Sequence, residues 1–175
     1  MRTAVLAGLA VLAFGGCRGD AGEAIAAPTT GAVAANATVE WVVDGDTIDV
    51  IIDGRDERVR LTGIDTPELP HESDGARPAQ LGECFGTEAQ AYAAALLPVG
   101  TPVRLVRDVV GRDDYGRILA YVYRASDGVF VNYEMVRQGY AQPLTIPPNV
   151  AHAERFVAAA REAEAAHAGL WDACG

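Results

Sequence analysis

The sequence predicts an α+β fold, in which five short β-strands close into a small barrel and three α-helices pack against it. Three observations support this prediction. Five β-prone runs are separated by tight-turn signals, a helix-like segment follows the third run, and 50% of the residues are hydrophobic. Five strands with a helix after the third are typical of a closed barrel of the OB type. Closing the sheet removes the exposed edges that short strands would otherwise present.

The first three strands are predicted over residues 38–43, 48–52 and 58–64. The runs are rich in β-branched and apolar residues, and the third alternates polar with apolar side chains. Turn signals join them, with the sequence D-G-D-T at residues 44–47 and D-G-R-D at residues 53–56. The three strands therefore form a meander.

The second half of the chain predicts two further strands and the three helices. The expected elements are a helix over residues 88–97, strands over residues 102–107 and 117–124, and helices over residues 132–138 and 150–168, the last capped by Asn149. Residues 69–83 are rich in proline, glycine and charge and form a long loop. Long loops in compact domains are often functional.

The N-terminal segment, residues 1–16, is interpreted as an export signal. Residues 4–14 are apolar, which is too short a run for a membrane-spanning helix. The small residues before Cys17 resemble a bacterial lipoprotein cleavage site, which predicts cleavage before Cys17 and its lipidation; plain secretion is the alternative. Residues 17–37 are an Ala/Gly-rich tether, and residues 38–175 form the domain. We expect an exported monomer that meets the membrane only through the lipid, or a secreted or periplasmic protein.

Two further cysteines remain if Cys17 is lipidated. Export places Cys84 and Cys174 in an oxidising compartment, which favours a disulfide between them. Two free thiols are the alternative. The chain has no CxxC motif and no nearby histidine that would complete a zinc site with these cysteines.

The net charge of −10 argues against broad, non-specific coating of nucleic acid, because that mode of binding needs a basic surface. All 14 basic residues are arginine. A polyanionic substrate would therefore be held by a few arginines or by a bound cation.

Two aspartates lie at the ends of predicted strands. Asp46 is in the first turn and Asp65 follows the third strand, so a twisted meander can place them side by side. Two carboxylates with the Thr66 carbonyl suit a hard divalent cation whose shell is completed by water, and Asp44 would orient them. The alternative for D-G-D-T is an ordinary turn.

Two arginines and a glutamate accompany these carboxylates. Arg60 and Arg117 lie in predicted strands, and guanidinium groups bind phosphate through paired hydrogen bonds. Glu68 stands three residues after Asp65, where it could activate a water molecule as a general base. The alternatives are surface or ion-paired arginines and an exposed glutamate without a role.

Four motifs in order make the chain resemble the thermonuclease (staphylococcal nuclease-like) family over residues 39–171. They are D-G-D-T at 44–47, R-L-x-G-I-D-T-P-E at 60–68, D-x-Y-G-R at 113–117 and V-N-x-x-M-V-R-Q-G-Y-A at 131–141. The resemblance implies an OB-type barrel with three helices. It also implies calcium-dependent cleavage of phosphodiester bonds in DNA and RNA, leaving 3′-phosphate ends.

The resemblance also implies roles for individual residues. These are calcium ligands at Asp46, Asp65 and the Thr66 carbonyl, phosphate binding by Arg60 and Arg117, Glu68 as the candidate base, and Tyr115 as a hydrogen-bond donor to a nucleotide phosphate.

The chain departs from the family pattern at three places. Asp114 replaces a lysine before the tyrosine, no tyrosine occurs near residues 144–146, and the 69–83 loop carries His71 and Arg77 where lysines are usual. These changes, with the net charge, predict weak ground-state binding of DNA. Two other functions remain open: a non-catalytic OB-fold module that binds nucleic acid, and a calcium-binding structural lipoprotein of the envelope.

Overall fold

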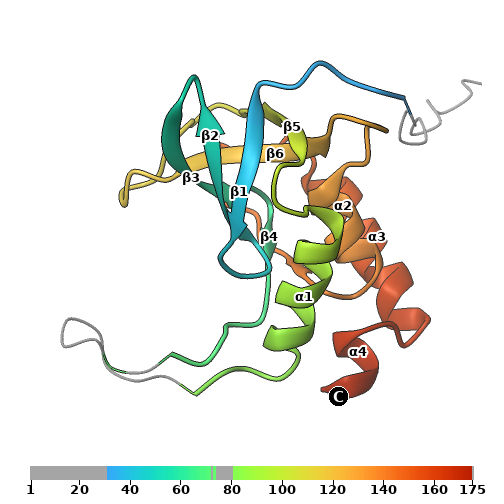
Figure 1. Ribbon diagram of the computed structural model, residues 1–175. Helices are drawn as coiled ribbons and strands as arrows, with labels where there is room; N and C mark the ends of the chain where they lie inside the picture. The colour runs from blue at the N-terminus through green and yellow to red at the C-terminus, as the bar shows by residue number, and fades with distance from the viewer. Residues whose placement is uncertain (1–30, 72, 74–80, 175) are drawn as a thin grey trace, which may run out of the picture.

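The computed structural model describes residues 31–71, 73 and 81–174 (Figure 1). Its centre is a closed barrel in the order β1-β2-β3-β6-β5, formed by β1 (Ala37–Val42), β2 (Thr47–Ile52), β3 (Arg55–Leu61), β5 (Pro102–Val106) and β6 (Ile118–Arg124). All neighbouring pairs are antiparallel except β3 and β6, which are parallel. The barrel and the predicted α+β class are therefore confirmed.

Four helices gather on one side of the barrel in the described part of the chain (Figure 1). They are α1 (Gly86–Leu96), α2 (Val131–Arg137), α3 (Ala153–Ala165) and the single turn α4 (Leu170–Ala173). A two-stranded sheet of β4 (Ile64–Asp65) and β7 (Gln142–Pro143) joins the meander to the segment after α2. No helix among the described residues is long and apolar enough to cross a membrane.

The core lies inside the barrel and between the barrel and its helices. Residues in β5 alternate between exposed and buried, as expected for strands with one face in a core. Val50, Val59 and Val103 fill the barrel interior, and Phe130 and Phe156 extend the core toward the helices. Burying side chains of this size contributes about 1.5–3 kcal/mol each, so the barrel and the helices form one structural unit.

Three local predictions need correction. The predicted strand over residues 58–64 divides into β3 and β4, because Gly63 takes a left-handed φ of 84° that interrupts an extended chain. Asn149 does not cap α3, whose N-cap is His152. The Asn149 side chain bonds instead to the backbone N–H and C=O of Val110, at 2.8 and 2.9 Å. The turn α4 was not predicted.

The structure joins Cys84 to Cys174 by a disulfide, with the two Cα atoms 5.9 Å apart. It links Cys84, which lies just before α1, to Cys174, which directly follows α4. The predicted signal segment, Cys17 and most of the tether lie outside the described residues.

Candidate active site

The site is organised around Arg60, on β3. Asp46 stands just before β2, and Asp65 ends β4. Nη2 of Arg60 contacts Oδ2 of Asp46 at 3.1 Å and Oδ1 of Asp65 at 2.8 Å. Because one nitrogen meets both carboxylates, the fold brings the two predicted metal ligands side by side.

The Arg60 guanidinium is held in one orientation. Its Nη1 donates to the carbonyl oxygens of Leu61 and Ile64, at 2.9 and 2.8 Å. Only 14% of its side chain is exposed. Because two backbone carbonyls fix Nη1, Nη2 already faces the carboxylates in the folded protein. The entropy cost of ordering this side chain is therefore met during folding and not when a ligand binds.

Asp46 is bound to the segment that follows β4. Its Oδ2 accepts hydrogen bonds from the Thr66 N–H (2.8 Å) and the Thr66 hydroxyl (3.0 Å), and its Oδ1 accepts from the Thr47 hydroxyl at 3.2 Å. Gly45 makes this approach possible, since a Cβ at that position would lie 2.8 Å from the Thr66 side chain. Asp44 supports the same turn by accepting the Asp46 N–H at 3.0 Å.

Burial raises the pKa of Asp46 to about 7, and the negative charge of Asp44 acts in the same direction. Arg60 and the two hydrogen bonds from Thr66 oppose this rise in the pKa. The carboxyl therefore titrates near neutral pH, and a cation placed beside it would favour its ionised form.

The carboxylate pair fits a hard cation such as calcium. Asp46 offers a buried carboxylate, while 57% of the Asp65 side chain is exposed, so water can reach that edge of the pair. Calcium accepts such a mixture of carboxylate, carbonyl and water oxygens. Within the described ranges, no group of three or more His, Cys, Asp or Glu side chains forms a metal cage. A cation here would therefore need the Thr66 carbonyl and water as well.

Glu68 lies near the same charges. Partial burial raises its pKa, and so do the charges of Asp44, Asp65 and Glu83, while Arg60 acts in the opposite direction. A carboxyl whose pKa is raised toward neutral pH is better matched to accept a proton there. Its main-chain N–H donates to Oε2 of Glu83 at 3.1 Å.

Arg117 and Tyr115 come from the loop between β5 and β6. Nε of Arg117 donates to Oδ2 of Asp113 at 2.7 Å, and Oδ1 of Asp113 accepts the N–H groups of Tyr115 (3.0 Å) and Arg117 (2.9 Å). Although burial raises the pKa of Asp113, these hydrogen bonds hold it below the usual value. The guanidinium carbon of Arg117 lies 5.5 Å from the centre of the Tyr115 ring, and Tyr115 is 86% exposed.

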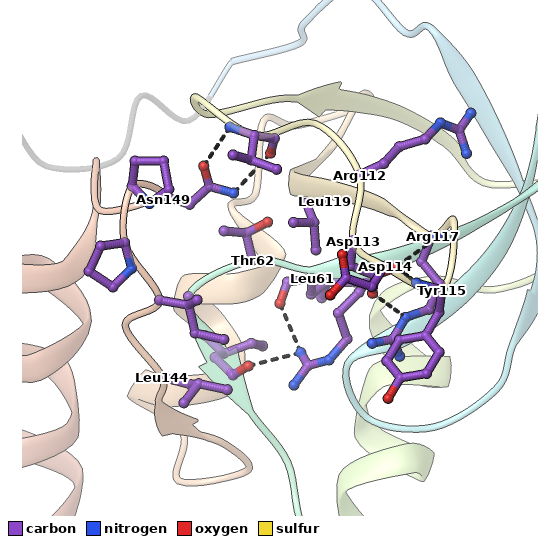
Figure 2. A pocket seen from close by; sticks show the side chains of 17 residues that line it. Leu61, Thr62, Arg112, Asp113, Asp114, Tyr115, Arg117, Leu119, Leu144 and Asn149 are labelled. Carbon is purple, nitrogen blue, oxygen red and sulfur yellow. Dashed lines mark hydrogen bonds and ion pairs between the residues drawn. The ribbon is translucent and has the colours of Figure 1, made fainter.

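A cavity of about 410 Å³ connects the two arginines. Figure 2 shows Tyr115 and Arg117 on one wall, with Leu144 and Asn149 on the other. Arg60 borders the same cavity, whose apolar lining includes Leu61 and Ile64, Leu119 of β6, and the segment after β7. The fold thus brings together Arg60, Arg117 and Tyr115, which are separated by up to 57 positions of sequence between Arg60 and Arg117.

Residues 58–173 match the family described as staphylococcal nuclease homologue. The chain belongs to the staphylococcal nuclease family. It is 36% identical over 134 residues to the thermonuclease of Staphylococcus intermedius, covering 77% of this chain and 74% of that one. It is 32% identical over 130 residues to the thermonuclease of Staphylococcus hyicus, covering 74% and 72%. Endonuclease YncB of Bacillus subtilis is 30% identical over 141 residues, which are 80% of this chain and 63% of that one.

The family resemblance predicted from the four motifs is thereby confirmed. The structure of this staphylococcal nuclease homologue adds residues that the sequence did not single out. Asp113 holds Arg117, and Glu83 holds the main chain of Glu68. Leu144 and Ile146 form a cavity wall in the segment where the family pattern has a tyrosine. The spacing of Asp113 and Arg117 in D-x-Y-G-R could have predicted their ion pair. The other contacts join residues that are far apart in the sequence, and no local pattern predicts them.

Proposed function

We propose that this protein is an exported, calcium-dependent endonuclease that hydrolyses phosphodiester bonds in DNA and RNA. One observation carries the proposal: two fixed arginines, Arg60 and Arg117, border one cavity beside the Asp46–Asp65 carboxylate pair. The non-bridging oxygens of a phosphodiester are negatively charged and bind to positive groups. This arrangement supplies two guanidinium groups and a site for a cation. The thermonuclease and endonuclease relatives support the same reaction class.

The cavity gives a nucleotide both of the surfaces it needs. The aliphatic wall that includes Leu119, Leu144 and Ile146 suits the flat face of a base or a sugar. Tyr115 presents its hydroxyl to solvent at the rim, where a phosphate would lie. Among the described residues, the ion pair of Arg117 uses Nε alone, so its two Nη groups remain for a phosphate.

The reaction in this proposal is hydrolysis in which water attacks phosphorus. A calcium ion bound at Asp46, Asp65 and the Thr66 carbonyl would supply positive charge to the phosphate and lower the pKa of a water molecule. Glu68 accepts a proton from the attacking water, whose oxygen forms the new bond to phosphorus. The bond from phosphorus to the 5′-oxygen breaks, and that oxygen takes a proton from solvent, which leaves a 3′-phosphate and a 5′-hydroxyl.

Arg60 and Arg117 stabilise the charge that grows on the phosphoryl oxygens as this bond breaks. Hydrogen-bond donors fixed before the reaction stabilise a transition state by about 2.7–4 kcal/mol each. Both arginines are fixed in this way, Arg60 by the Leu61 and Ile64 carbonyls and Arg117 by Asp113.

Binding of the ground state is expected to be weak. Several other arginines are engaged in surface ion pairs, with Arg58 bonded to Asp49 and Arg112 to Glu57. With a net charge of −10, few cations remain to contact phosphates outside the site. The dependence of affinity on salt should therefore correspond to only a few phosphate contacts.

Export and lipidation at Cys17 belong to the same proposal and are supported by the apolar segment and the small residues before that cysteine. Mass spectrometry of the mature N-terminus tests them. Diacylglycerol on an N-terminal Cys17 is the expected result. An unmodified residue other than Cys17 at the N-terminus contradicts lipidation.

Digestion of single-stranded DNA and of RNA, with calcium and with chelator, tests the reaction. We expect cleavage only with calcium, and a fall of orders of magnitude in Glu68→Gln. Glu88→Gln, an exposed glutamate in the first turn of α1, is the control and should retain activity. Calcium-independent cleavage, or full activity in Glu68→Gln, contradicts the proposal. Binding of oligonucleotide or calcium without turnover would indicate a non-catalytic OB-fold module or a calcium-binding lipoprotein of the envelope.

A further inference from the structure

The main chain of Glu68 is bonded on both sides to Glu83. The N–H of Glu83 donates to the carbonyl of Glu68 at 2.8 Å, and the N–H of Glu68 donates to Oε2 of the Glu83 side chain at 3.1 Å. We call this pair of contacts the Glu68–Glu83 bridge. It joins the two ends of the long loop, so the main chain of Glu68 does not depend on the loop alone for its position.

The start of α1 packs against the same carbonyl. A Cβ on Gly86 would lie 2.5 Å from the Glu68 carbonyl oxygen and 3.1 Å from that of Pro67. Only a glycine allows this approach, and the Gly86 N–H is bonded back to the Glu83 carbonyl at 3.2 Å. Residues 83–86, which we call the support segment, therefore pack against the main chain of Glu68.

The disulfide fastens the support segment to the C-terminal turn. Cys84 lies between Glu83 and Gly86 in the sequence, and its partner Cys174 directly follows α4. The turn α4 is anchored by buried Leu170, whose N–H donates to the Gly139 carbonyl at 2.8 Å. A covalent path thus runs from the helical side of the molecule to the residue next to Glu83.

The Glu68 side chain has no hydrogen bond to another part of the described chain. Among the described residues, the contacts that place Glu68 are therefore those of its main chain with Glu83 and Gly86. Misplacing a reacting group by about 1 Å can lower a rate about 10²-fold. The position of Glu83 is consequently a determinant of what Glu68 can do.

We propose that Glu83 is a positioning residue for Glu68 and that the Cys84–Cys174 disulfide holds Glu83 in place, so that reduction of this disulfide lowers turnover. The inference rests on the proposed function of Glu68. Both cysteines are exposed, so a dissolved thiol or phosphine can reach the bond. The nuclease would then be fully active only where disulfides persist, as in an oxidising compartment.

Substitution of Glu83 tests the positioning role. Glu83→Ala removes the acceptor for the Glu68 N–H, and we expect kcat to fall about 10- to 100-fold with KM within about twofold, because the substrate-binding arginines are untouched. Glu83→Gln keeps an oxygen that accepts the same N–H and should restore kcat to within about threefold of wild type. The control is Glu88→Ala, in the first turn of α1, with kcat unchanged.

The disulfide is tested by treating the wild type with a phosphine reductant and by the double variant C84S/C174S. Both should show the fall in kcat seen for Glu83→Ala, at a temperature well below their unfolding transitions. The reductant should not affect C84S/C174S. Adding Glu83→Ala to C84S/C174S should lower kcat little further, because both changes act through residues 83–86. Full kcat in the reduced wild type overturns the disulfide's role.

A measurement without turnover separates this inference from the proposed function. Amide exchange of Glu68, followed by NMR without calcium, should become at least about tenfold faster in Glu83→Ala and in the reduced protein, while barrel amides such as that of Val50 keep their protection. Unchanged exchange at Glu68 overturns the inference even if the enzyme is active. Faster exchange throughout the barrel also overturns it, since that is general unfolding. An inactive wild type removes the proposed function and leaves this test in force.

Discussion

Replacing Arg117 by alanine separates catalysis from stability most cleanly. Arg117 borders the cavity, and its only ion pair within the described residues is with Asp113. Removing one preorganised donor to a developing charge lowers kcat about 10²- to 10³-fold. Within the described part of the chain, neither Nη group of Arg117 is in an ion pair, so both can bind phosphate oxygens. We therefore expect a loss of at least this size, seen in kcat more than in KM.

The same change should affect stability little. The side chains of Arg117 and Asp113 are 31% and 18% exposed, and ion pairs that water can reach contribute about 0–1 kcal/mol. Asp113 still accepts the N–H groups of residues 115 and 117 in the variant, so the loop keeps its shape. A change in melting temperature of only a few degrees is expected.

The assay is steady-state cleavage of a fluorescent single-stranded oligonucleotide at saturating calcium, with thermal melting of each variant. Arg112→Ala is the matched control, because Arg112 lines the same cavity but is bonded through both Nη groups to Glu57, at 2.7 and 2.9 Å. Arg112→Ala should keep kcat within a few-fold of wild type. Arg117→Lys should recover only part of the loss, because an ammonium group cannot bind Asp113 and two phosphate oxygens in the same geometry. A kcat for Arg117→Ala within tenfold of wild type, or an equal loss in Arg112→Ala, would refute the reasoning.

Three further predictions concern the metal, the substrate and the fold. Because burial raises the pKa of Asp46 to about 7, this carboxyl is mostly protonated at pH 6 and ionised at pH 8; calcium should therefore raise the melting temperature more at pH 8, and Asp46→Asn should lose this calcium effect. Tyr115 is 86% exposed, so Tyr115→Phe should raise KM several-fold and leave kcat and the melting temperature unchanged in the same oligonucleotide assay. Asn132 is fully buried and bonds the Val122 N–H and the Thr62 carbonyl, so Asn132→Ala should lower the free energy of unfolding in urea by about 2–4 kcal/mol.

The barrel was predictable because its signals are local. The D-G-D-T and D-G-R-D turns, between runs rich in β-branched and apolar residues, predict β1, β2 and β3 from neighbouring residues alone. The closing contacts are not local: the parallel register of β3 and β6 pairs Val59 with Ile118, and no pattern in either segment specifies that partner. Asn149 illustrates the same limit, since a cap and a contact with a distant loop need the same side chain.

The residue types of the site were predictable, but their connections were not. Asp46, Asp65 and Arg60 stand in recognisable motifs, yet the shared Nη2 contact depends on how β3 and the segment after it fold back on the turn. Glu83 is one of three acidic residues in the 69–83 loop, and no motif in the sequence marks it. Its hydrogen bonds to Glu68 are what reveal a role. Long-range contacts of this kind leave no periodicity in the sequence.

An acidic nuclease is a physical contradiction only if affinity for the ground state drives the reaction. The cations at the cavity are few, but Arg60 is fixed by two carbonyls and Arg117 by Asp113, so their orientation is set during folding. Interactions that strengthen as charge develops raise kcat, whereas uniform attraction to the polyanion only lowers KM. Carboxylates beside the arginines weaken the uniform attraction and keep the guanidinium groups in place. The acidic surface and an active site built from fixed arginines are therefore compatible parts of one design, and together they predict a nuclease with a high KM and no loss of kcat.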